Sequence, residues 1–162
     1  MTTDRALGCK RSIAGVRLRS PSPCARDTAI FRGMADSFTE LSGLRVTVDQ
    51  VTFMPSLDAP PERPFPFVYF ITIHNDSDET VTIKGRKWVV VDMKGDTIVV
   101  EGDGVVGKFP KLLPGEHFSY NSYHTIGSDS VAQGAFIGTT DEDRPVLTRI
   151  PKFEMKVPEA NS

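Results

Sequence analysis

Apolar and polar side chains alternate along most of the chain after Leu44, and this two-residue period narrows the possible folds more than any other feature. In the segment FPFVYFITIH, every second residue from Phe65 to Ile73 is aromatic or aliphatic. An extended strand points such residues to one face, where they can enter a core. The 3.6-residue period of an amphipathic helix is missing from this part of the sequence, so the pattern predicts strands.

Seven strand-like segments lie between residues 44 and 157, with polar turns such as His74–Thr80 at short intervals. About 100 residues in seven short strands is typical of an immunoglobulin-like or fibronectin type III-like β-sandwich. A barrel is the alternative. The sequence therefore predicts an all-β domain over residues 37–162.

Several irregularities are expected within these strands. The alternation changes phase at Asp49–Gln50, as a β-bulge would produce, and Gly85 favours a second bulge or bend. Pro151 stands at another change of phase and predicts a kinked or edge strand. Pro64 and Pro66 fit only an edge strand or the start of one.

The first 36 residues differ in composition and are predicted to form a disordered basic tail. Residues 1–33 carry a net charge of +5, and the SPSPCARD segment gives no sign of packing. Three interpretations remain open: an organellar transit peptide, a disordered basic arm, or an extension upstream of a true start at Met34.

The charge of the remaining chain and the placement of its cysteines exclude several classes of function. The remainder carries −7, which argues against a nucleic-acid-binding domain because phosphate contacts need clustered Lys and Arg. Cys9 and Cys24 both lie in the tail, so the domain has no thiol for a disulfide, zinc or catalysis. No segment is long and apolar enough for a membrane helix. We expect a cytoplasmic protein that binds neither membranes nor nucleic acid.

Gly102, Gly104 and Gly107 spell the G-x-G-x-x-G pattern of dinucleotide-binding proteins. That pattern binds pyrophosphate only where a helix follows it, because the helix N-terminus supplies the N–H groups. Pro110 and Pro114 follow within a few residues and prevent a helix from growing. The dinucleotide interpretation therefore fails.

Two interpretations of the glycine segment remain. Residues Gly102–Gly107 could form a nest of backbone N–H groups for a small anion, with Lys108 and Lys111 adding positive charge. The favoured interpretation is instead a glycine-rich connection that crosses the end of the sandwich. The first interpretation makes phosphate or pyrophosphate the candidate ligand.

The same segment resembles the ApaG family. The stretch GRKWVVVDMKGDTIVVEGDGVVGKFPKLLPGEHFSYNS, residues 85–122, contains that family's pattern in order and at the correct spacing, and the resemblance extends over roughly residues 40–157. The matching residues are Arg86 and Trp88, Gly102 to Gly107, Pro110, Pro114 to Glu116, Tyr120 with Ser122, Gly134, Gly138, Ile150 with Pro151, and Phe153.

Three positions depart from the family pattern: Phe109 replaces a Gln, Tyr123 a Gly and Ala132 a Met. The resemblance implies a fibronectin type III-like sandwich. It also implies a link to cobalt and magnesium resistance in bacteria, without an established reaction, and a role in protein interaction in larger eukaryotic proteins. We therefore expect a non-enzymatic module that recognises a protein, with phosphate or pyrophosphate binding as the alternative.

The histidines, acidic residues and serines of the chain lack the spacing that a metal site or a catalytic site needs. His117 and His124 should face opposite sides of one strand, and His74 closes another, so solvated or hydrogen-bonded histidines are expected. The acidic clusters Asp76–Glu79 and Asp141–Asp143 look like turns without an EF-hand pattern. No nucleophile elbow accompanies the serines near His124. The sequence predicts no metal site, no cofactor and no catalytic residue.

Arg86 and Trp88 lie two residues apart and therefore on one face of a strand. One interpretation places Trp88 in the core with the Arg86 stem alongside it. The other is an exposed pair that binds a partner protein. Both remain open from the sequence alone.

Overall fold

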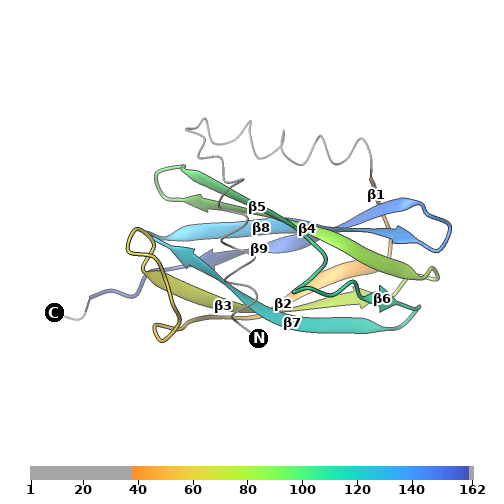
Figure 1. Ribbon diagram of the computed structural model, residues 1–162, viewed down its shortest axis with the longest axis horizontal. Helices are drawn as coiled ribbons and strands as arrows, with labels where there is room; N and C mark the ends of the chain where they lie inside the picture. The colour runs from red at the N-terminus through yellow and green to blue at the C-terminus, as the bar shows by residue number, and fades with distance from the viewer. Residues whose placement is uncertain (1–37, 161–162) are drawn as a thin grey trace.

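The computed structural model describes residues 38–160, which form two β-sheets packed face to face (Figure 1). The predicted all-β sandwich is confirmed, and no helix occurs within the described range. The strands are β1 (Thr39–Glu40), β2 (Leu44–Phe53), β3 (Phe65–Asn75), β4 (Val81–Asp92), β5 (Thr97–Asp103), β6 (Lys111–Leu112), β7 (His117–Ile126), β8 (Ser130–Thr140) and β9 (Pro145–Met155).

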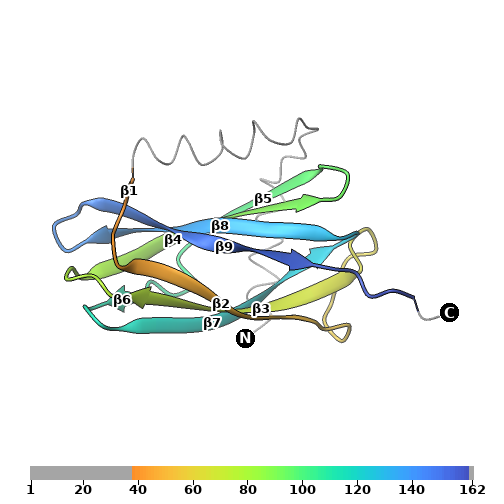
Figure 2. The same ribbon diagram turned by 180° about the vertical axis from the view of Figure 1, so that it is seen from behind.

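The larger sheet has the order β1-β9-β8-β4-β5, with β6 also paired to β4, and the smaller sheet has the order β2-β3-β7. Figures 1 and 2 show these two layers from the front and from behind. At one edge β2 lies next to β9, where the Thr148 hydroxyl donates to the Leu44 carbonyl at 2.9 Å. This hydrogen bond joins the two sheets.

The seven longer strands correspond to the seven predicted segments. The two additional strands, β1 and β6, contain two residues each. A two-residue strand is too short to show a period of two, which is why the sequence pattern did not reveal it.

The predicted irregularities are also present. The register shifts immediately before Gln50 in β2 and immediately before Gly85 in β4. A third shift, between β8 and β9, falls where Pro151 interrupts the pairing. Pro66 is the second residue of β3, the central strand of its sheet, so the strand-start interpretation of this proline is confirmed.

Aromatic side chains from both sheets meet in the middle of the sandwich. Trp88 on β4 is 1% exposed, and its ring centroid lies 4.9 Å from that of Tyr69 on β3 and 5.8 Å from that of Phe153 on β9. Burial of large aromatic side chains is a major source of stability in a domain of this size. Trp88 therefore lies at the centre of the hydrophobic core.

The predicted basic tail, residues 1–36, lies outside the described residues, and so do Cys9 and Cys24. Within residues 38–160 there is no helix that could cross a membrane.

Candidate functional site

The connection from β5 to β7 passes from the larger sheet to the smaller one and is fastened to β4 along its length. The Gly104 N–H donates to the Lys84 carbonyl at 2.7 Å, and the Ile83 N–H donates to the Pro110 carbonyl at 2.9 Å. The short strand β6 then pairs with the first residues of β4. We call residues 104–113 the crossover segment, and its backbone is held in place by these bonds.

The glycines of this segment build a tight hairpin turn. The Val105 N–H donates to the Lys108 carbonyl at 2.7 Å, and the Lys108 N–H returns a bond to Val105 at 3.0 Å. The two residues between them, Val106 and Gly107, both have positive φ, as a type I′ turn requires. The turn directs the Val105 side chain into the core, where it is 0% exposed. The turn that these glycines build therefore covers part of the core with the Val105 side chain.

This geometry favours the structural interpretation of the glycine segment over the anion-site interpretation. The N–H groups of Gly104 and Val105 donate to carbonyl groups of the protein, so they do not point together at a ligand. Lys111 forms an ion pair with Asp141 at 3.2 Å, and Lys108 is exposed to solvent, where salt screens its charge. Gly102 lies within β5, paired with Arg86.

We accordingly expect pyrophosphate to produce no saturable amide NMR shifts in residues 102–111 at millimolar concentration. The physical reason is that the amides of Gly104 and Val105, two of those in the Gly102–Gly107 segment, already donate to protein carbonyls. Saturable shifts that disappear in the Lys108→Gln/Lys111→Gln variant would show that the turn binds anions after all.

Arg86 supports the crossover segment from inside the sandwich. Its Nη1 group donates to the carbonyls of Asp103 at 3.1 Å and Gly104 at 2.9 Å. The guanidinium lies over Gly102, where an added Cβ would come within 3.0–3.1 Å of it. Two sets of residues that the sequence analysis treated separately are therefore joined, with the arginine holding the glycine segment.

Trp88 occupies the core, as the first interpretation of the Arg86–Trp88 pair predicts. Because its side chain is 1% exposed, the alternative of a surface tryptophan that binds a partner is wrong for Trp88. The physical reason is that β4 lies between β8 and β5 in the larger sheet, and its Trp88 face is covered by the smaller sheet.

His124 faces the core, whereas His117 projects from the other face of β7, as predicted. The His124 ring lies 4.8 Å from both Trp88 and Tyr69, between centroids. Its Nε2 atom is enclosed and has no hydrogen-bond partner among the described residues, so this nitrogen departs from the expectation of a solvated or hydrogen-bonded ring. Burial, then the charges of Arg86 and Arg63, lower the pKa of His124 to about 3.

The acidic clusters are engaged by basic side chains. Asp76 accepts a hydrogen bond from Arg45 at 2.6 Å, Glu79 pairs with Arg144, and Asp141 pairs with Lys111. Among residues 38–160 no group of three His, Cys, Asp or Glu side chains is placed to hold a metal ion.

The crossover segment presents apolar side chains to solvent, which the sequence analysis did not identify. Phe109 is 54% exposed and Leu113 is 49% exposed, while Leu112 between Lys111 and Leu113 is buried. The outward-pointing residues Phe109, Lys111 and Leu113, here called the crossover stripe, follow the two-residue spacing of an extended chain. Because Phe109, Pro110, Leu112 and Leu113 are all apolar, no alternation in the sequence marked the exposed side of this segment.

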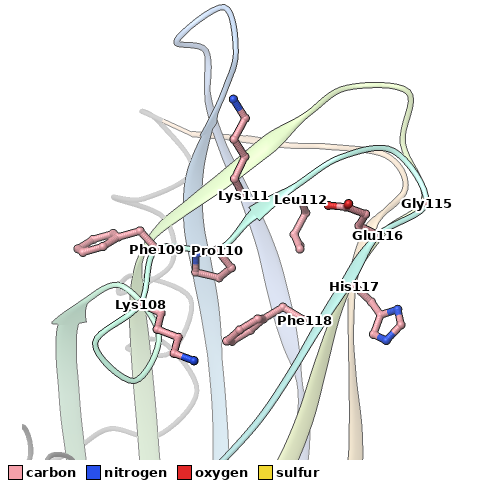
Figure 3. A pocket seen from close by; sticks show the side chains of 9 residues that line it. All are labelled: Lys108, Phe109, Pro110, Lys111, Leu112, Gly115, Glu116, His117 and Phe118. Carbon is pink, nitrogen blue, oxygen red and sulfur yellow. The ribbon is translucent and has the colours of Figure 1, made fainter.

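A shallow groove of about 680 Å³ lies between the crossover segment and the start of β7. Figure 3 shows Leu112 and Phe118 on the inner side, with Phe109 and Lys111 pointing away from them. Asn75 fixes the backbone beside the groove, since its buried side-chain amide donates to the Leu112 carbonyl at 2.8 Å. The site thus combines a rigid backbone, two exposed apolar side chains and a hollow.

Comparison with known proteins settles the family. The model of the ApaG domain matches residues 55–138. The chain belongs to the ApaG family. Two proteins named ApaG illustrate the relationship: that of Vibrio cholerae is 32% identical over 110 residues, covering 67% of this chain and 87% of that protein. The protein of Methylococcus capsulatus is 32% identical over 116 residues, covering 71% of this chain and 91% of that protein.

Solved structures agree with the ApaG fold. A crystal structure of a Bordetella pertussis protein described as ApaA has a TM-score of 0.61 and 25% identity, covering 76% of this chain and 99% of that one. An X-ray structure from a structural-genomics programme has a TM-score of 0.65 and 24% identity, covering 73% of this chain and 89% of that one. The name ApaG, which the Vibrio cholerae and Methylococcus capsulatus proteins carry, denotes no reaction.

Proposed function

We propose that this ApaG-family chain is a non-enzymatic module that recognises a partner protein through the crossover stripe and the adjoining groove. The observation that carries the proposal is the exposure of Phe109 and Leu113 on a segment whose backbone is bonded to β4. Large apolar side chains exposed beside a hollow are a common feature of interaction sites. We place this function in the cytoplasm, because residues 38–160 contain no cysteine that would form a disulfide.

Rigid presentation makes these side chains suitable as anchors. The Pro110 carbonyl accepts a hydrogen bond from the Ile83 N–H, and the Leu112 side chain is buried. The backbone next to Phe109 and Leu113 is therefore fixed. A partner that covers them gains apolar burial without first having to order the segment. Aromatic anchors beside a pocket are common among the residues that dominate binding energy.

Phe109 also departs from the family pattern described above, in which Gln is common at that position. The substitution places a large apolar ring on the surface beside the groove. A link to cobalt or magnesium resistance, implied by the family resemblance, is compatible with this proposal because a recognition module can influence ion balance through its partner.

The test compares partner capture by the wild type, by Phe109→Ser/Leu113→Ser and by Met93→Ser. Met93 is a matched control because it is 78% exposed but lies in the turn at the opposite end of β4 from β6. We expect one recurrent protein to be retained by the wild type and by Met93→Ser. With that protein purified, the double variant should bind about tenfold or more weakly, since losing one anchor commonly costs more than 1 kcal/mol.

Equal affinity of the wild type and the Phe109→Ser/Leu113→Ser variant for the captured protein would contradict the proposal. A retained protein that is lost only in Met93→Ser would move the interface to the other end of the sandwich. Pyrophosphate binding at the glycine turn is the alternative function, and the NMR titration described above decides it.

A further inference from the structure

Two histidines far apart in the sequence face each other on the outer surface of the smaller sheet. His74 on β3 and His117 on β7 are direct partners in the strand register. Their ring centroids lie 6.0 Å apart. His117 is exposed, and Figure 3 shows its ring pointing away from Leu112 and Phe118, toward the other face of β7.

Hydrogen bonds around His74 determine which of its ring nitrogens carries the proton. The Thr47 hydroxyl donates its single hydrogen to Asp49 at 2.9 Å. In the 3.0 Å hydrogen bond between Thr47 Oγ1 and His74 Nε2, the imidazole N–H must therefore be the donor and the hydroxyl oxygen the acceptor. In the neutral ring, Nε2 carries the hydrogen and Nδ1 keeps its lone pair.

The surrounding network holds this arrangement in place. Asp49 also accepts a hydrogen bond from the Thr72 hydroxyl at 2.6 Å, and Thr72 is bonded to Ser119 at 2.8 Å. These bonds tie β2, β3 and β7 together beside the histidines. Arg45 is the neighbour of His74 on β2, and its guanidinium donates to Asp76 at 2.6 Å, so its charge has a partner.

We propose that His74 and His117 together bind a divalent transition-metal ion that prefers imidazole nitrogen, such as Ni²⁺, Cu²⁺ or Zn²⁺, with water completing the coordination. Metal–nitrogen bonds of about 2.0–2.1 Å place the centroids of two ligating rings about 5 Å apart. A rotation of the exposed His117 side chain would close the remaining separation. Mg²⁺ prefers oxygen ligands and is not expected to bind there.

The hydrogen bond that His74 makes with Thr47 supports this assignment. A histidine that ligates a metal usually donates its other N–H to an oxygen, which orients the ring. In this protein Thr47 supplies that oxygen and Asp49 orients Thr47. The sequence analysis found no such pair because the two histidines become neighbours only through strand register.

The test is calorimetric titration of the full chain with NiCl₂ in a non-coordinating buffer, with amide NMR to locate the site. We expect one ion per chain, with resonances near residues 74 and 117 affected. His117→Asn and His74→Asn should each weaken binding at least tenfold, and the double variant should abolish it. Thr47→Val should weaken binding roughly tenfold through loss of the supporting contact.

His124→Gln is the matched control, because it removes a histidine that faces the core, and it should bind Ni²⁺ like the wild type. His117 is exposed, so His117→Asn should stay folded and keep the test informative. Binding that survives the double substitution, for example at the thiols of Cys9 and Cys24, would overturn the proposal. Absence of saturation at millimolar Ni²⁺, or equally strong binding of Mg²⁺, would overturn it as well.

Discussion

Gly104→Ala is expected to lower the free energy of unfolding by about 3 kcal/mol or more, the largest effect of any single methyl group added to the crossover segment. Gly104 has a φ of 61°, where a residue with a Cβ costs about 1–2 kcal/mol. Its added Cβ would also lie 2.4 Å from the Lys108 carbonyl oxygen. That contact forces the turn apart and displaces Val105, whose burial contributes about another 1.5–3 kcal/mol.

Gly107→Ala is the matched control for this prediction. Gly107 also has a positive φ, of 75°, but no atom lies within 4 Å of its added Cβ. This variant should lose only about 1–2 kcal/mol from the backbone conformation. Urea unfolding of both variants measures the difference. Equal losses would show that the close approach to Lys108 does not restrict the turn.

Acidification from pH 7 to pH 5 is expected to destabilise the domain by about 2 kcal/mol through His124 alone. Its pKa is lowered from 6.5 to about 3 in the folded protein, mainly by burial and then by Arg86 and Arg63. The unfolded chain therefore takes up the proton first as the pH falls. The stabilisation is complete above pH 6.5 and is lost progressively as the pH falls toward 3.

The measurement is urea unfolding at pH 7 and pH 5 for the wild type and for His124→Gln. The variant has no imidazole at this position, so its stability should fall by about 2 kcal/mol less over the same interval, whatever its stability at pH 7. His74 and His117 are present in both proteins, so any contribution from them is absent from the difference between the two. The His124 ring resonances should also keep their neutral positions at pH 5. Identical pH dependence of the two proteins would assign the acid sensitivity to other groups.

The strands and their irregularities could be predicted from the sequence because they depend on local patterns. The alternation from Phe65 to Ile73 placed β3, and the phase changes near Gln50 and Pro151 located register shifts. The turn at Pro114–Gly115 was also predicted, and Gly115 has the positive φ of 86° that such a turn uses. Each of these features involves neighbouring residues only.

The candidate site could be predicted only in part. The spacing of Arg86 and Trp88 placed both on one face of β4 and favoured a core position for Trp88, but it left the surface interpretation open. The Trp88 face is buried because the smaller sheet covers β4, and this is a long-range contact. The exposure of Phe109 and Leu113 also depends on a long-range contact, since only the pairing of β6 with β4 shows which side of the crossover segment faces solvent.

The sequence by itself determined the two-residue period, the bulges, the turns and the family of this protein, because residues adjacent in the chain encode them. The tertiary structure decided where the glycine amides point and which histidines meet. The N–H groups of Gly104 and Val105 are satisfied by carbonyls of Lys84 and Lys108 once the turn folds against β4. His74 and His117 become partners only through the register of β3 with β7. Such pairings join distant segments, and a local pattern carries no record of them.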